Sequence, residues 1–152
     1  MDIIDVIVNF NKDAGLLEKG YSDFLESSFQ IEEALEGFSF ASLDRALYGD
    51  ASIIPLTAKA MSRGIVNLCY DSTQPLADVN RLDKACDAFV FAVGSMAKLG
   101  LTADQIRHSL AIVMHKNMQK LTMPKDQYGK LLKPDNFEGP EPELQKILDQ
   151  RG

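Results

Sequence analysis

The chain has 152 residues, 45% of them hydrophobic and 25% charged, which predicts one globular domain with a core of ordinary size. Its net charge of -6 and isoelectric point near 4.9 argue against a general nucleic-acid-binding protein, because nucleic acid attracts a concentrated positive surface. A nucleotide that carries its own metal ion remains compatible with this charge.

The cysteine content and the N-terminus indicate a cellular compartment. Cys69 and Cys86 form no CxxC motif and have no histidine at zinc-binding spacing, so we expect two buried thiols in a reducing compartment. The N-terminus lacks a basic signal region, and no apolar run is long enough to cross a bilayer. These features predict a cytoplasmic protein, in the host cytoplasm if a phage encodes it, with neither membrane nor nucleic acid as a partner.

Apolar residues recur at three- and four-residue intervals along most of the chain, which predicts an all-α protein. Ser22 is expected to cap the second helix, and Gly100 to end the longest one. Thr102 and Gln105 form a capping box at the start of the next helix. The expected helices cover residues 3–14, 22–38, 41–48, 55–70, 76–99, 102–121 and 143–150.

These helices predict a bundle of about four main helices with shorter ones added, in a single domain that covers residues 1–152. Residues 122–152 form a tail that contains Gly and Pro and ends in a short helix. The middle stretch, residues 39–74, is less regular than the rest of the chain, with helical patterns at 41–48 and 55–70.

Carboxylates at helical spacing are the main candidates for a functional site. Glu32, Glu33 and Glu36 are separated by steps of three and four within one segment, and Asp83 and Asp87 lie one helical turn apart in another. The alternative is that they are solvated faces of amphipathic helices. No Lys or Arg lies within one turn of the three glutamates, and apolar residues flank both groups, so we favour a cation site.

Carboxylate oxygens are the ligands that Mg²⁺ prefers, usually in a shell shared with water and substrate phosphates. Gly94 lies two turns after Asp87 on the same face, where the missing side chain would let a helix or ligand approach. Four or five acidic groups exceed the needs of one Mg²⁺, so two or more ions are expected. The chemistry implied is phosphoryl transfer to water.

The motifs also carry a resemblance. The run EEALE at 32–36 resembles the EExxE motif of the all-α nucleoside triphosphate pyrophosphohydrolases, the MazG-like and phosphoribosyl-ATP pyrophosphohydrolase-like superfamily. Asp83 and Asp87, followed by an aliphatic run that ends in Gly94 and Ser95, are similar to its third-helix signature. Many relatives carry an acidic residue where this chain has Lys84, so Asp83 must supply the second carboxylate. The segments NMQKL at 117–121 and GKLLKP at 129–134, with Pro140 beyond them, resemble the ending of the phosphoribosyl-ATP branch.

This resemblance implies a magnesium-dependent hydrolase, with Mn²⁺ as a substitute ion. It implies that Glu32, Glu33, Glu36, Asp83 and Asp87 hold the metal and orient a water for attack at the α-phosphate, releasing nucleoside monophosphate and pyrophosphate. One of the three glutamates would act as general base. The resemblance also implies that the triphosphate is bound by Asn117, Lys120, Lys130 and Lys133. For Lys130 and Lys133, an ordinary soluble surface is the alternative.

The expected substrate is a nucleoside triphosphate, more specifically a deoxynucleotide such as dGTP whose pool a phage enzyme would control. The family habit implies a homodimer or homotetramer. Phe10, Asn11 and Phe24 are candidates for a base pocket, although core packing is the expected role of both phenylalanines. The alternative function is a catalytically silent helical protein that binds nucleotides or assembles with partners and retains only the fold.

Overall fold

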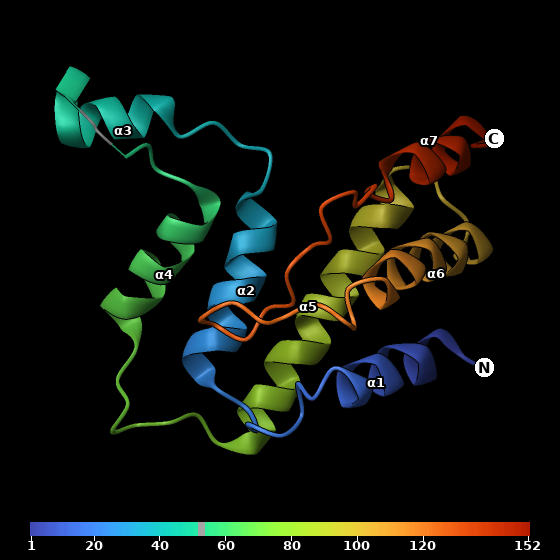
Figure 1. The fold of residues 1–152 in the computed structure, drawn as a ribbon, viewed down its shortest axis with the longest axis horizontal. Coiled ribbons are helices and arrows are strands. Elements are labelled where there is room, and N and C mark those ends of the chain that lie inside the picture. The colour runs from blue at the N-terminus through green and yellow to red at the C-terminus, as the bar shows by residue number, and fades with distance from the viewer. Residues whose placement is uncertain (52–53) are drawn as a thin grey trace. The chain divides into compact units, whose positions relative to one another are not determined.

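The computed structural model describes residues 1–51 and 54–152 and is all-helical within them (Figure 1). The described chain contains seven α-helices and one short 3₁₀ helix, and its strand pairing is limited to an isolated bridge between Lys125 and Leu131. The elements are α1 (Ile3–Asp13), α2 (Asp23–Leu35), α3 (Ala41–Tyr48), η1 (Gly49–Ala51), α4 (Ala58–Cys69), α5 (Asp78–Lys98), α6 (Ala103–Met118) and α7 (Glu141–Asp149). The predicted all-α class is confirmed.

The capping residues predicted from the sequence begin and end the helices as expected. The Ser22 hydroxyl accepts a hydrogen bond from the Leu25 N–H at 3.2 Å, at the start of α2. Thr102 and Gln105 form the reciprocal capping box of α6, with donor–acceptor distances of 3.3 and 2.9 Å. Gly100 follows α5 with φ of 86°, a left-handed conformation that a residue with a Cβ rarely adopts.

Most helices are shorter than the periodicity predicted, and the difference is largest for α2, α4 and α6. Helix α2 ends at Leu35, because Glu36 has an extended ψ of 139° and Gly37 turns the chain with φ of 85°. Helix α4 begins at Ala58, where the Thr57 hydroxyl caps the Ala60 N–H at 3.1 Å. Helix α6 ends at Met118. Glu36 is therefore the C-cap residue of α2: its N–H still donates to the Glu32 carbonyl at 3.0 Å, and the chain leaves the helix after it.

The chain divides into two compact units, and each is described by itself. The central unit, Tyr21–Arg81, contains α2, α3, η1, α4 and the first residues of α5. Helices α2 and α4 pack against each other (Figure 1), and the fully buried side chains of this unit are small, Ser28 on α2 and Ser62 on α4. Small side chains at a helix contact allow the two backbones to approach closely.

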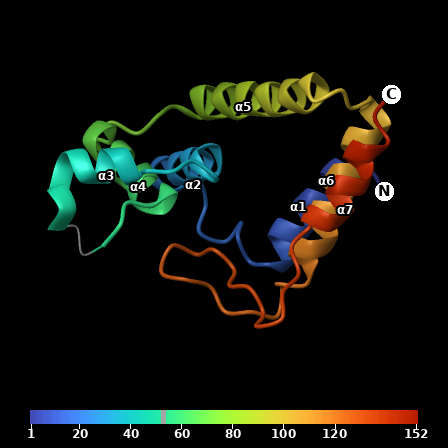
Figure 2. The ribbon, with the colours of Figure 1, turned by 90° about the horizontal axis from the view of Figure 1, so that it is seen from above.

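The second unit joins the N-terminal segment Met1–Gly20 to Leu82–Gly152. Helix α6 packs against both α1 and α7 (Figure 2). The buried apolar side chains of this unit are Ala14, Ile106, Ile112, Met114 and Ile147. On the surface of this contact, Lys116 of α6 forms an ion pair with Glu143 of α7, with Nζ and Oε1 3.0 Å apart.

Helix α5 buries none of its residues within the described structure. Val79, Leu82, Cys86, Phe89 and Val90 are exposed and lie at helical spacing on one side of it, and we call these residues the α5 stripe. Cys69, the last residue of α4, is also exposed, so the prediction of two buried thiols is wrong. No single helix in the described ranges is long and apolar enough to span a membrane. Helices α5 and α6 meet that criterion only as a pair bent by 114°.

Candidate functional site

The three predicted glutamates lie at the C-terminal end of α2. Glu32 is buried within the helix, Glu33 is exposed on it, and Glu36 is the exposed C-cap residue. The C-terminus of a helix carries a partial negative charge, which disfavours carboxylates there, and the last turn of α2 contains no basic residue. The last turn of α2 therefore does not itself neutralise these carboxylates, and positive charge must come from outside that turn.

Arg63 of α4 supplies positive charge to one of the three glutamates. Its Nη1 donates to the Glu32 carboxylate and also to the Ser62 hydroxyl, the latter at 2.9 Å. The guanidinium carbon lies 5.4 Å from the centre of the Phe29 ring. Because both charged side chains are about 90% buried, each compensates the desolvation of the other. The sequence did not reveal this partner, because Arg63 is 31 residues away from Glu32.

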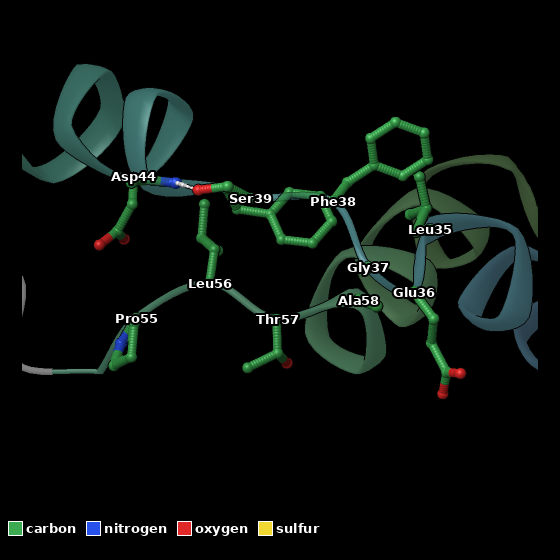
Figure 3. A pocket seen from close by; sticks show the side chains of 12 residues that line it. Leu35, Glu36, Gly37, Phe38, Ser39, Asp44, Pro55, Leu56, Thr57 and Ala58 are labelled. Carbon is green, nitrogen blue, oxygen red and sulfur yellow. Dashed lines mark hydrogen bonds between the residues drawn. The ribbon is translucent and has the colours of Figure 1, made fainter. Parts of the chain in front are cut away.

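The exposed end of α2 borders a pocket of about 460 Å³ in the central unit, which we call the Glu36 pocket (Figure 3). It lies between the loop that leads from α2 into α3 and the segment that leads into α4. In Figure 3 the Glu36 and Asp44 carboxylates lie at opposite ends of the pocket and do not point toward each other. The lining residues are Leu35, Glu36, Gly37, Phe38, Ser39, Phe40, Ala41, Asp44, Pro55, Leu56, Thr57 and Ala58.

A second pocket of the central unit, of about 290 Å³, lies along the N-terminal part of α2, and we call it the Tyr70 pocket. Apolar side chains of α2 and α4 form much of its wall, and the segment after α4 contributes Tyr70 and polar groups. Phe24 holds the Tyr70 ring in a tilted contact, with centroids 5.8 Å apart. The lining residues are Asp23, Ser27, Ile31, Ile65, Val66, Cys69, Tyr70, Asp71, Gln74 and Leu76.

An ionic network beside this pocket was not predicted from the sequence. Asp23, in the first turn of α2, accepts hydrogen bonds from Arg81 Nε at 3.1 Å, Arg81 Nη2 at 3.0 Å and the Leu76 N–H at 3.1 Å. Arg81 also pairs with Asp78 at 3.0 Å and lies over the Tyr21 ring. These carboxylates, Asp23 first, raise the pKa of Arg81 above its ordinary value. The network ties the start of α5 to the start of α2.

Asp83 and Asp87, the predicted opposite wall of a metal site, are exposed residues of α5 and belong to the other unit. Gly94, on the same helix, has no atom of another element within 4 Å of an added Cβ, so the expected close approach is not seen in the described residues. Over residues 1–51 and 54–152, no three His, Cys, Asp or Glu side chains are close enough together to hold a metal ion. The five-carboxylate metal site thus stays a prediction.

Three of the four predicted phosphate-binding residues do come together, in the unit that contains α6. Lys120 donates to the Asn117 side-chain oxygen at 2.8 Å, and its Nζ lies 4.9 Å from the centre of the Phe137 ring. Lys133 Nζ lies 5.7 Å from the same ring. Two ammonium groups therefore face one aromatic side chain. We call Asn117, Lys120, Lys133 and Phe137 the Phe137 cluster.

Lys130, the fourth residue predicted to bind phosphate, lies in the turn that the Lys125–Leu131 bridge closes. Its backbone N–H donates to the Asp126 carboxylate at 3.0 Å, and its carbonyl accepts from the Asp126 N–H at 2.8 Å. The backbone of Lys130 is thus part of a hydrogen-bonded turn with Asp126. The sequence did not predict that Phe137 contacts these lysines, because a motif records the order of residues and not which side chains meet.

Comparisons with known proteins do not assign this chain to a family. No protein-family model, curated protein or solved structure matches it.

Proposed function

We propose that the chain is a magnesium-dependent nucleoside triphosphate pyrophosphohydrolase of the MazG-like kind, which converts a (d)NTP to (d)NMP and pyrophosphate. The observation that carries the proposal is the acidic C-terminal end of α2. Three glutamates lie where the helix dipole opposes them, and the last turn of α2 holds no basic residue of its own. Glu36, the C-cap residue, also lines a pocket, so a divalent cation bound by its carboxylate would lie beside space for a substrate.

The proposed role of each carboxylate follows from its exposure and its hydrogen-bond partners. Glu33 and Glu36 are exposed, and their carboxylate oxygens suit Mg²⁺ chemically. Asp83 and Asp87 keep the metal-binding role that the resemblance implies. The metal, when bound, would polarise the phosphate and lower the pKa of an attacking water. Glu36 is our choice for the general base, because its carboxylate lines the pocket and makes no ion pair among the described residues. Glu32 would serve to position the end of α2, since its carboxylate accepts a hydrogen bond from Arg63.

The Phe137 cluster supports the phosphate-binding part of the proposal. Lys120 and Lys133 bring two positive charges to one place in an otherwise acidic protein, and lysine binds phosphate as a point charge. Asn117 fixes the Lys120 ammonium by accepting its hydrogen bond. We propose that this cluster binds the triphosphate of the substrate. The homodimer or homotetramer and the cytoplasmic location belong to the same proposal.

The second candidate is a catalytically silent helical protein that binds nucleotides or assembles with partners. The Glu32–Arg63 ion pair favours it, because a carboxylate committed to a buried arginine serves as a structural tie between α2 and α4. In that case the glutamates would hold the fold together without handling a metal. The two candidates differ in whether pyrophosphate is released.

The deciding experiment incubates the protein with each common NTP and dNTP and Mg²⁺, and assays pyrophosphate and orthophosphate separately. The hydrolase proposal predicts pyrophosphate from at least one nucleotide. We expect Glu36→Gln to reduce kcat on the order of 10²-fold or more, the usual contribution of a general base, without unfolding the protein.

Glu18→Gln is the matched control, since Glu18 is an exposed glutamate of the other unit and should leave the rate unchanged. Release of orthophosphate would rule out cleavage at the α-phosphate. A folded protein that cleaves no nucleotide would leave the silent candidate.

A further inference from the structure

The Tyr70 pocket has the size of one heteroaromatic ring system. Its volume of about 290 Å³ lies at the lower end of the range of about 300 to 1,000 Å³ that is typical of small-molecule pockets. A single ring system such as a purine base suits a pocket of that size, whereas a whole nucleoside triphosphate is several times larger than its base. Ile31 and Ile65 offer aliphatic walls, and Tyr70, held by Phe24, offers an aromatic one. Flat apolar walls of this kind favour a flat ligand over a branched one.

The charges that line the pocket exclude phosphate from it. Its titratable lining groups include Asp23 and Asp71, and no Lys or Arg is among the lining residues. Asp23 is engaged by Arg81 and by the Leu76 N–H, through both carboxylate oxygens. Among the described residues Asp71 forms no ion pair with a cation, so its negative charge at the pocket repels an anion. An uncharged ring that presents hydrogen-bond donors is what this rim would accept.

The Asp71 carboxylate is held in place by hydrogen bonds and can accept a further one from a ligand. Its Oδ1 accepts two hydrogen bonds from Thr73, from the backbone N–H at 2.9 Å and from the hydroxyl at 2.7 Å. These bonds lower the pKa of the Asp71 carboxyl below its ordinary value, so the group stays ionised. Both bonds go to one oxygen, and Oδ2 accepts none from the described residues. Gln74 lines the same pocket, and its side-chain amide adds both a donor and an acceptor to this rim.

We propose that the Tyr70 pocket binds the base of an amino-bearing purine, with Asp71 Oδ2 accepting from the exocyclic amino group and Gln74 contacting the neighbouring ring edge. This inference rests on the proposed function in one respect, namely that the purine belongs to the nucleotide substrate. Adenine and guanine both carry the amino group. Hypoxanthine and unsubstituted purine lack it and should bind less well. The pyrimidines would leave part of the pocket unfilled.

The test uses nucleosides without phosphate or metal, so that binding is independent of hydrolysis. We would measure dissociation constants of guanosine, inosine, adenosine and purine riboside for the full chain by NMR titration, following the backbone N–H of Thr73 and the side-chain amide of Gln74. The amino-bearing nucleoside of each pair should bind about tenfold more tightly than its partner, as expected for a hydrogen bond to a charged acceptor.

Two variants and a control sharpen this test. Asp71→Asn should remove most of the discrimination within each pair, whereas Asp50→Asn, an exposed carboxylate outside the pocket, should preserve it. Ile65→Trp should fill the pocket and abolish binding of all four nucleosides. Ile65 is 39% exposed, so the larger ring can be accommodated, and circular dichroism verifies that each variant is folded.

The inference is overturned if no nucleoside perturbs the two reporter groups, or if Asp71→Asn discriminates as well as the native chain does. Its failure is separable from that of the proposed function. Pyrophosphate release without nucleoside binding at Tyr70 would reject the base pocket alone. Nucleoside binding without pyrophosphate release from any nucleotide would reject the hydrolase alone and leave a nucleotide-binding protein.

Discussion

At the scale of single residues, the Glu32–Arg63 ion pair joins two side chains that are both about 90% buried. The pair links α2 to α4, the two helices that carry the fully buried Ser28 and Ser62. Each charge of the pair offsets the desolvation cost of the other, and a buried charge that loses its partner keeps that cost in full. Removing one partner and removing both should therefore have very different effects.

We expect Arg63→Met to lower the free energy of unfolding by about 3 to 5 kcal/mol, because it strands the Glu32 carboxylate in a buried site. The double variant Glu32→Leu/Arg63→Met should recover most of that loss, since no charge remains buried. Urea unfolding followed by tyrosine fluorescence measures both, because three of the four tyrosines, Tyr21, Tyr48 and Tyr70, lie in the central unit.

Arg45→Met provides the control. Arg45 pairs with Asp50 at 3.8 Å, but the two side chains are 74% and 97% exposed, so the loss should stay below about 1 kcal/mol. An Arg63→Met variant as stable as the Arg45→Met variant would show that the buried pair is not a structural tie.

At the scale of elements, the helices depend on contacts at their ends and on one face each. Helix α7 is the clearest example, since its nine residues are too few to be stable alone. It is held on α6 by Ile147, which is 4% exposed, and by the ion pair between Glu143 and Lys116. The hydrogen bond from Lys116 lowers the pKa of the Glu143 carboxyl. The attachment of α7 should therefore depend on pH.

The direction in which stability changes with pH follows from the lowered pKa of Glu143. A carboxyl whose pKa is lower in the folded state stabilises that state above its ordinary pKa of 4.5, and loses this effect as the pH falls through the folded value. We expect Glu143→Gln to melt at a lower temperature than the native chain at pH 7, and the difference between the two proteins to shrink as the pH falls below 4.5. Thermal denaturation monitored by circular dichroism measures the difference. A difference that does not change between pH 7 and pH 3 would contradict the role of this ion pair.

At the scale of the whole molecule, the α5 stripe is the feature that the described contacts leave unexplained. Val79, Leu82 and Val90 are each more than 60% exposed, although their spacing is that of a face that packs on another helix. Exposed apolar faces of this kind are typical of association surfaces. The proposed homo-oligomer would cover this stripe.

We expect the native chain to form a dimer or larger species in sedimentation experiments at micromolar concentration. Val90→Asp should weaken that association by at least about tenfold in Kd, since a charge would enter an apolar contact. Phe91→Asp is the matched control, because Phe91 is 74% exposed but lies off the stripe and should leave the association intact. A native chain that sediments as a monomer would reject the proposed oligomer.

Much of the fold was determined by the sequence alone, because it depends on local chemistry. Periodicity and the caps at Ser22, Thr102 and Gly100 placed the helices to within a few residues, since these signals act between neighbours in the chain. The end of α2 was missed by three residues. There the left-handed Gly37 outweighed the apolar periodicity that continues to Phe38.

The candidate sites were determined by the sequence only in part. The chain itself identified which residue types were in unusual places, such as the glutamates at the end of α2 and the lysines after α6. Only the tertiary structure decided their partners: Arg63 for Glu32, Phe137 for the two lysines, and Asp71 with Tyr70 around one pocket. The physical reason is that ion pairs, ring contacts and pockets join residues distant in the chain, and no local spacing records which distant helix packs against which.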